Sequence, residues 1–137
     1  MRLLIDANIL LDVLQKREPH YKDSSLVWKL CETGQDEGVV SALTFANLVY
    51  ILRKELDAGQ VRSVLDKLQL IFTFADYTAS DMEKAADLEW DDYEDAIQSV
   101  TAERLTADYI ITRNVRDYSE STITAFTPSE YLARRYG

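Results

Sequence analysis

The sequence predicts an α/β fold in which helices cover both faces of a parallel sheet. Short apolar runs without alternation, of which Leu3–Ile5 is the first, are typical of strands that are buried on both faces. These runs alternate with longer segments whose apolar residues recur at helical spacing. A strand, a helix and a second strand in succession form a right-handed crossover, which makes the two strands parallel.

Five strands are expected, and each is a short apolar run. They are Leu3–Ile5, Gly38–Ser41, Ile71–Phe74, Tyr109–Thr112 and Ile123–Phe126. Asp6 ends the first run abruptly, so the chain is expected to open with a short central strand.

Helices are expected between the strands, where apolar residues recur every three or four positions. The predicted segments run from Asn8 to the interruption at Arg17-Glu18-Pro19, from Lys22 to Thr33, from Thr44 to Leu56, from Val61 to Leu70, from Ser80 to Leu88, from Asp92 to about Ala107, and from Pro128 onward. Asn8 and Ser80 are expected to be N-caps. Gly34 suits a left-handed helix end, and Pro128 suits a first helical turn.

The length of 137 residues fits one domain, expected to span residues 1–137, with no repeat or flexible linker. Lys and Arg number 15 and Asp and Glu 24, so the formal net charge is −9. This charge has the wrong sign for a protein that grips nucleic acid by charge alone. The single Cys31 cannot form an internal disulfide, and no apolar run is long enough to span a bilayer, so we expect a cytoplasmic protein without membrane contact.

The expected functional site lies at the carboxyl ends of the strands, because a parallel sheet has its crevice there. Asp6 follows the first predicted strand, and Arg113–Asp117 follows the fourth. Asp92 and Asp95 begin the helix that precedes the fourth strand. Because they are three residues apart, they project from one helix face toward the same edge.

As many as four carboxylates therefore surround one crevice, and this is costly unless a cation neutralises them or some are protonated. Mg²⁺ and Mn²⁺ bind carboxylate and water oxygens and keep positions open for phosphate. Asp6, Asp92, Asp95 and Asp117 are all candidates to bind such an ion. The chemistry that fits is metal-dependent phosphodiester cleavage.

Nearby side chains have further expected roles. Arg113 and Arg116 lie beside the acids in the sequence and are expected to contact substrate phosphates. Purely local roles are also open for the acids, because Asp6 and Asp92 precede helices that they can cap, and Asp117 suits a turn.

Five segments occur in a fixed order over nearly the whole chain. They are Leu3-Leu4-Ile5-Asp6-Ala7-Asn8, Ser41-Ala42-Leu43-Thr44, Asp92-Tyr93-Glu94-Asp95-Ala96, Ile111-Thr112-Arg113-Asn114 and Thr127-Pro128. In this order they resemble the stand-alone PIN domain, the family that includes the VapC-type toxins of bacterial toxin-antitoxin pairs. The resemblance implies a three-layer α/β/α fold around a mainly parallel five-stranded sheet. It also implies a Mg²⁺- or Mn²⁺-dependent endoribonuclease, an RNA substrate and an antitoxin partner. Asp6 matches the first metal-binding Asp, and Asp95 matches the Asp that begins the central helix. On this resemblance we expect Asp6, Asp95 and Asp117 to bind the ion, with Asp92 as an auxiliary acid.

Two positions depart from the family pattern. Asn47 stands in the third helix where many PIN domains have a Glu, and Asn114 stands where many have an Asp. An amide oxygen can bind a metal or accept a hydrogen bond, but it adds no negative charge. Asp117, three residues beyond Asn114, is expected to substitute or assist, and Thr112 is expected to support the site through its hydroxyl.

Two other functions are open. A PIN-like binding module that has lost catalysis and acts through protein partners is favoured by Asn47 and Asn114. A phosphoacceptor receiver domain shares the size, acidity and α/β alternation, but it needs an acidic pair after the first strand and a Lys after the fifth. Asp6 is followed by Ala7 and Asn8, and no Lys follows residue 84.

The third predicted helix suggests a partner. Val49, Tyr50 and Leu52 together exceed what one helix face can bury, which predicts a homodimer or a groove for an antitoxin segment. Packing in the core or at such an interface is also the role expected for Tyr50, in preference to stacking on a base.

Overall fold

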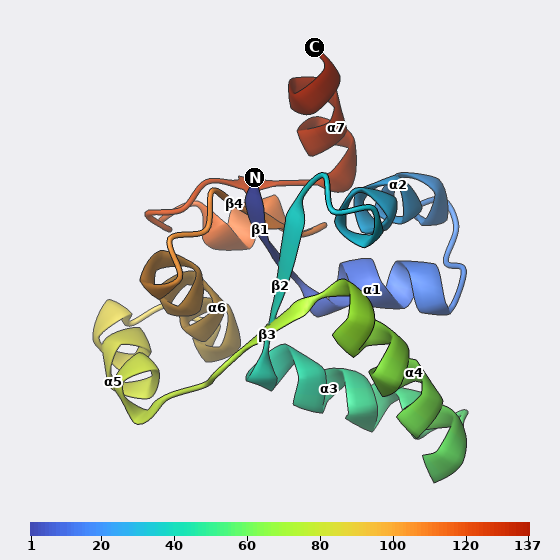
Figure 1. The fold of residues 1–137 in the computed structure, drawn as a ribbon. Helices are drawn as coiled ribbons and strands as arrows, with labels where there is room; N and C mark the ends of the chain where they lie inside the picture. The colour runs from blue at the N-terminus through green and yellow to red at the C-terminus, as the bar shows by residue number, and fades with distance from the viewer.

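Five parallel strands form the centre of the computed structural model, which describes residues 1–137 (Figure 1). The strands are β1 (Arg2–Ile5), β2 (Glu37–Ser41), β3 (Thr73–Ala75), β4 (Tyr109–Ile111) and β5 (Ala125–Phe126). Their order in the sheet is β3-β2-β1-β4-β5, and every neighbouring pair is parallel. The predicted parallel sheet is confirmed, with β1 at its centre.

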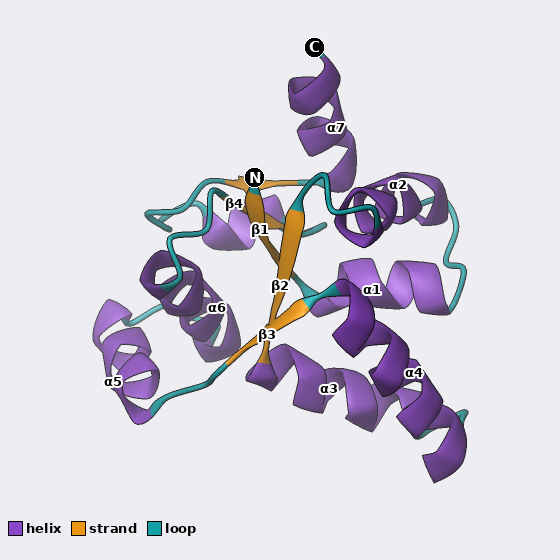
Figure 2. Cartoon of the chain, viewed as in Figure 1, coloured by secondary structure: helices purple, strands orange, loops and turns teal.

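Seven helices and one 3₁₀ helix accompany the strands, and the last of them follows β5. They are α1 (Ala7–Leu14), α2 (Tyr21–Glu32), α3 (Ala42–Leu52), α4 (Ala58–Ile71), α5 (Ala79–Leu88), α6 (Tyr93–Arg104), η1 (Val115–Tyr118) and α7 (Pro128–Tyr136). Figure 2 shows α1 to α4 on one side of the sheet and α5 and α6 on the other, which confirms the three-layer α/β/α fold. None of these helices has the length and apolar character needed to cross a membrane.

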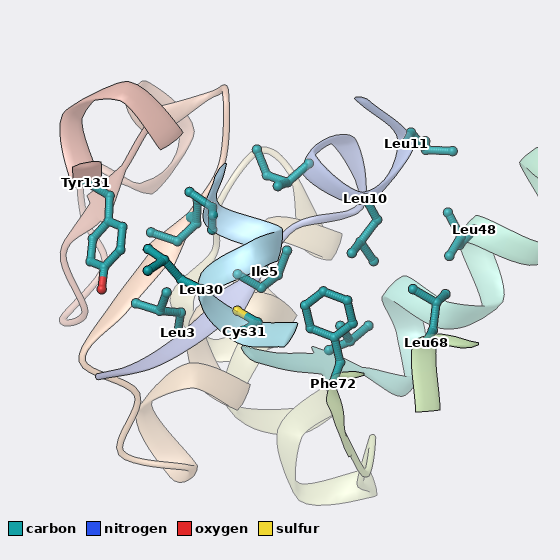
Figure 3. Packing of buried hydrophobic residues seen from close by; sticks show 14 of the residues in the cluster. Leu3, Ile5, Leu10, Leu11, Leu30, Cys31, Leu48, Leu68, Phe72 and Tyr131 are labelled. Atoms are coloured by element: carbon teal, nitrogen blue, oxygen red, sulfur yellow. The ribbon is translucent and has the colours of Figure 1, made fainter. Parts of the chain in front are cut away.

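Strand β1 shows why its residues are apolar without alternation. Leu3 and Ile5 belong to the larger core beneath α1 to α4, and Figure 3 shows Leu3 beside Leu30 and Cys31 of α2. The intervening Leu4 packs in a separate core on the opposite face of the sheet. Leu3, Leu4 and Ile5 are therefore all buried, whichever face of the sheet they occupy.

Capping explains where two helices differ from the prediction. Asp6, rather than Asn8, caps α1, because the Ala7 amide donates to Asp6 Oδ1 at 2.8 Å. Thr78, rather than Ser80, caps α5 through a reciprocal pair of hydrogen bonds with Asp81. In both cases the cap is the residue with an extended backbone and a free side-chain oxygen, and the helix begins directly after it.

The predicted helix pair is also shifted. Ser41 caps α3 by accepting a hydrogen bond from the Thr44 amide, so α3 begins earlier than expected and ends at Leu52. Asp57 caps α4, which continues through Ile71. The third strand therefore begins at Thr73, two residues later than predicted. Smaller differences are that α6 ends at Arg104 and that β5 contains only Ala125–Phe126. The left-handed Gly34 (φ 77°) and the position of Pro128 at the first turn of α7 are as predicted.

Helix α3 exposes fewer apolar residues than the sequence predicts. Leu52 is 3% exposed and belongs to the core, and Val49 packs against that core. Only Tyr50, at 71% exposed, extends into solvent. The homodimer predicted from these residues remains a prediction, and it now depends on fewer of them.

Candidate active site

The centre of the sheet is the point where the order of the strands reverses. From β1 the chain adds β2 and β3 on one side, and it then crosses to add β4 and β5 on the other. Such a reversal leaves a crevice beyond the carboxyl ends of the two central strands. Asp6 directly follows β1, and Thr112 directly follows β4, whose Ile111 pairs with Ile5 in register. The two polar segments predicted to meet are therefore adjacent.

Asp6 is held in place from three directions. The hydroxyl of the fully buried Thr112 donates to Asp6 Oδ2 at 2.8 Å, and the amide of Ala7 donates to Oδ1 at 2.8 Å. Asn8 Nδ2 lies 3.4 Å from Oδ2 as a longer third donor. The Thr112 hydroxyl also accepts a hydrogen bond from the Asn114 amide at 3.1 Å. Thr112 thus fixes both the Asp6 carboxylate and the start of the following loop.

The first turn of α6 brings two more acids to this edge. Asp92 caps the helix by accepting a hydrogen bond from the Asp95 amide at 3.1 Å, as the local interpretation predicts. Asp95 is half-buried, and its Oδ1 accepts a hydrogen bond from the Tyr118 hydroxyl at 3.1 Å. The capping geometry and the Tyr118 contact together orient the Asp95 carboxyl group.

Burial and neighbouring carboxylates raise the pKa of Asp95 and of Asp6. Burial raises the pKa of Asp95 to about 7, with Asp92 as the next largest cause. Asp6 and Asp117 raise it further, whereas the hydrogen bond from Tyr118 opposes the shift. Burial also raises the pKa of Asp6, against the hydrogen bonds from Thr112 and Ala7. A cation placed among these groups would stabilise their charged forms, which offsets both the cost of burying the charges and the repulsion between them.

Two grooves meet at Asp95. We call the first the Asp6 groove, because Asp6 and Asp95 line it together with Asn47, Glu94 and Asn114. We call the second the Asp117 groove, which Asp92, Asp95, Arg116 and Asp117 line. The structure therefore divides the predicted site. Asp6 and Asp95 share one groove, and Asp92 and Asp117 lie on the other side of Asp95.

Arg113 has a partner inside the protein. Its Nε lies 3.2 Å from Oδ2 of Asp12, whose side chain is fully buried, and the Ser24 hydroxyl donates to the same oxygen at 2.9 Å. The Arg113 amide is 3.4 Å from Asn8 Oδ1. Of the two arginines predicted to contact substrate phosphates, Arg116 is the one that is exposed at a groove.

Sequence reasoning missed three residues of the site. Glu94 accepts a hydrogen bond from Asn47 Nδ2 at 3.2 Å, which places a carboxylate beside the amide that replaces the usual helix acid. Gln98, 4% exposed, binds Ser41 and Thr44 through its side-chain amide. Both lie on one face of α6, four residues apart, and this spacing was a usable signal. Nothing local in the sequence marks Tyr118.

The donor set fits a hard divalent cation. No three acidic, histidine or cysteine side chains lie close enough to form a complete protein cage. Mg²⁺ needs no such cage, because it binds through one or two carboxylates and completes its shell with water and substrate phosphate. Asp6 and Asp95 supply two carboxylates, and the exposed Asn114 adds an amide oxygen at the same groove.

Without divalent metal, the protein should lose stability as the pH rises from about 4 to about 7. The pKa of Asp95 is raised from 3.8 to about 7 in the folded state, so the folded protein holds a proton that the unfolded chain has released, and stability falls through this interval. Because water screens the half-exposed carboxyl group, we expect a loss on the order of 1 kcal/mol. Thermal unfolding in EDTA across this range measures the effect.

Asp95→Asn is the matched control for this pH dependence, since other acids titrate in the same range. The variant should lose less stability than the parent, and Mn²⁺ added near neutral pH should restore the parent more than the variant. Equal pH dependence of the two proteins would contradict the raised pKa of Asp95.

A PIN domain family model matches residues 2–116 of the chain. No curated protein matches the sequence at a significant level. Among solved structures, a chain of a toxin-antitoxin complex from Klebsiella pneumoniae is 21% identical with a TM-score of 0.71, over 92% of this chain and 97% of that one. A chain of VapBC-1 from nontypeable Haemophilus influenzae is 17% identical with a TM-score of 0.72, over 94% of this chain and 99% of that one.

A third similar structure is VapC20 of Mycobacterium tuberculosis, a sarcin-ricin loop cleaving toxin. It is 13% identical with a TM-score of 0.65, over 96% of this chain and 94% of that one. At these identities the structures show a shared fold. Because the family match extends from β1 through the loop after β4, and so includes both segments that flank the crevice, the chain belongs to the PIN domain family.

Proposed function

We propose that the chain is a Mg²⁺- or Mn²⁺-dependent endoribonuclease. The observation that carries this proposal is the pair of carboxylates, Asp6 and Asp95, that line one groove at the centre of the sheet and have raised pKa values. Carboxyl groups with strongly shifted pKa values cluster at functional sites, because function there requires charges that destabilise the fold. Membership in the PIN domain family supports the same chemistry.

Each site residue has a distinct expected part. Asp6 and Asp95 would hold the ion, with Asp117 adding charge from the neighbouring groove. When bound, a divalent ion supplies Lewis-acid polarisation of the phosphodiester and makes water more acidic. Thr112 orients the carboxylate of Asp6, and Tyr118 orients that of Asp95. Arg116, which lines the Asp117 groove, would contact a phosphate of the substrate backbone.

We further propose that the protein is the toxin of a type II toxin-antitoxin pair. Similar structures come from toxin-antitoxin complexes, among them VapBC2 from Rickettsia felis bound to a DNA fragment from its promoter. An antitoxin that covers the acidic grooves would keep the nuclease inactive. A homodimer is also expected, and size-exclusion chromatography with light scattering tests it, since a strict monomer would exclude it.

RNA cleavage by the purified protein tests the proposed activity. Incubation with a mixture of structured and single-stranded RNA should produce fragments in Mg²⁺ or Mn²⁺ and none in EDTA. Fragments of equal yield in EDTA would show that the activity is not metal-dependent. No cleavage in either ion, over a range of concentrations and RNAs, would contradict the proposed function.

Asn47 and Asn114 favour a second candidate, a PIN-like binding module without catalysis that acts through protein partners. These amides stand where many family members carry acids, and the acids that remain do not form a complete cage. Calorimetry with Mn²⁺ separates the two candidates. Binding that disappears in Asp6→Asn supports the nuclease, and the absence of binding together with the absence of cleavage supports the binding module.

A further inference from the structure

The Asp6 groove has an apolar side as well as an acidic one. Leu11 of α1 and three residues of α3, namely Leu43, Tyr50 and Ile51, line it together with the acids. The groove is open and encloses about 450 Å³, which is sufficient for a nucleotide-sized group beside a hydrated ion. An apolar surface next to metal-binding acids suits a substrate with both a flat apolar part and an anionic part.

Tyr50 is the exposed member of this apolar side. Its side chain is 71% exposed, its hydroxyl makes no hydrogen bond within the protein, and its ring packs against no other aromatic ring. The ammonium of Lys54, one helical turn further, lies 5.1 Å from the centre of the ring. Of the two packing roles predicted for Tyr50, the core is therefore wrong, because the ring is exposed, and an interface stays a prediction.

Charge does not attract RNA into this groove. No Lys or Arg lines it, whereas Asp6, Glu94 and Asp95 do. Arg113, the cation nearest to Asp6 in the loop after β4, is paired with Asp12. With a net charge of −9 on the whole chain, RNA must be held there by contacts that need no bulk positive charge. Stacking of an unpaired base on an aromatic ring is such a contact.

We propose that Tyr50 is a stacking platform for an unpaired nucleobase of the RNA substrate, next to the phosphate at the acids. This inference rests on the proposed nuclease function and narrows its substrate to RNA that is single-stranded at the cleavage point. Because the Lys54 ammonium lies 5.1 Å from the centre of the ring, it would be within reach of the backbone phosphate of a nucleotide stacked there. The side-chain amides of Asn47 and Asn114 line the same groove and can hydrogen-bond the edge of the base.

Cleavage kinetics on a single-stranded oligoribonucleotide test this inference. Tyr50→Ala should raise KM about tenfold and leave kcat within about twofold of the parent, because the ring contributes to substrate binding. Tyr50→Phe keeps the aromatic ring and should retain the parental KM. Tyr136→Ala is the matched control, since Tyr136 is 70% exposed but lies in α7, outside both grooves, and its KM should not change.

Binding provides a second measurement that does not depend on turnover. Fluorescence anisotropy with a labelled oligoribonucleotide, in an Asp95→Asn background with Mg²⁺, should show weaker binding when Tyr50→Ala is added and parental binding with Tyr50→Phe. Thermal unfolding of Tyr50→Ala should match the parent, since the side chain is exposed.

The outcomes separate this inference from the proposed function. If the parent cleaves RNA and Tyr50→Ala has an unchanged KM, the stacking role of Tyr50 is wrong, whereas the proposed nuclease function is supported. If that variant instead loses self-association in light scattering with its KM unchanged, Tyr50 is a protein contact and the inference is overturned. If the parent neither binds nor cleaves RNA, the proposed function and the inference fail together.

Discussion

Asp95→Asn should lower the rate of metal-dependent RNA cleavage by about 100-fold or more, and Asp6→Asn should do the same. Both carboxylates line the Asp6 groove, and each substitution removes one of the two carboxylates that we assign to the ion there. Initial rates at saturating Mg²⁺ and at saturating Mn²⁺ measure the loss. Because an amide keeps the size of the side chain, the loss reports charge and metal binding rather than shape.

The local roles of these acids survive the substitutions. Asn caps helices about as well as Asp, so Asp6→Asn leaves α1 with a cap. An amide oxygen can still accept the hydrogen bond from Tyr118 in Asp95→Asn. Asp117→Asn, which removes charge from the neighbouring groove, should cause a smaller loss than either. Asp87→Asn, on the exposed side of α5, is the control that should change nothing. A parental rate in Asp95→Asn would show that the assigned site is wrong.

Arg113→Met should lower the free energy of unfolding by about 3–5 kcal/mol. The substitution leaves the Asp12 carboxylate fully buried with only Ser24 as a side-chain partner, and the other Asp12 oxygen, Oδ1, already lacks a hydrogen bond. The cost of an uncompensated buried charge exceeds the net contribution of the pair itself. Urea unfolding at fixed pH measures the change through the midpoint and slope.

The double variant Asp12→Leu/Arg113→Met separates the charge from the packing. Removing both charges together should restore stability to within about 1 kcal/mol of the parent, because an apolar pair of similar volume needs no ionic partner. Arg116→Met removes an exposed arginine without an ion pair and should change stability by less than about 0.5 kcal/mol. If Arg113→Met unfolds like the parent but has a raised KM for RNA, Arg113 serves the substrate after all.

The fold could be predicted from the sequence because its strands depend on burial alone. Leu3–Ile5 is apolar on every residue, and the structure places those residues in cores on both faces of the sheet. The carboxyl ends of β1 and β4 then had to meet, which brought Asp6 and Thr112 together as expected. These predictions depend on general rules for parallel sheets and not on the details of any contact.

The misplaced helix starts have a local cause. Asn8 and Ser80 are good capping residues by type, but Asp6 and Thr78 have the extended backbone that a cap requires. Residue type alone does not separate two capping candidates that are two positions apart, since the backbone that precedes each helix is set by the strand or loop before it.

The missed parts of the site depend on contacts between distant segments. The Arg113–Asp12 pair joins α1 to the loop after β4, and the bond from Tyr118 to Asp95 joins η1 to α6. Neither pair has a spacing that a helix or strand pattern can reveal. Tyr50 is different, because its helical spacing suggested burial, and only the structure shows that its position on α3 faces solvent.

Anomalous diffraction from crystals grown with Mn²⁺ tests the proposed metal site, because it locates the ion without reference to activity. The proposed site requires an anomalous peak in the Asp6 groove, within coordination distance of carboxylate oxygens of both Asp6 and Asp95, and the loss of that peak in crystals of Asp6→Asn. A peak confined to the Asp117 groove, or no peak between Asp6 and Asp95 at saturating Mn²⁺, would contradict it.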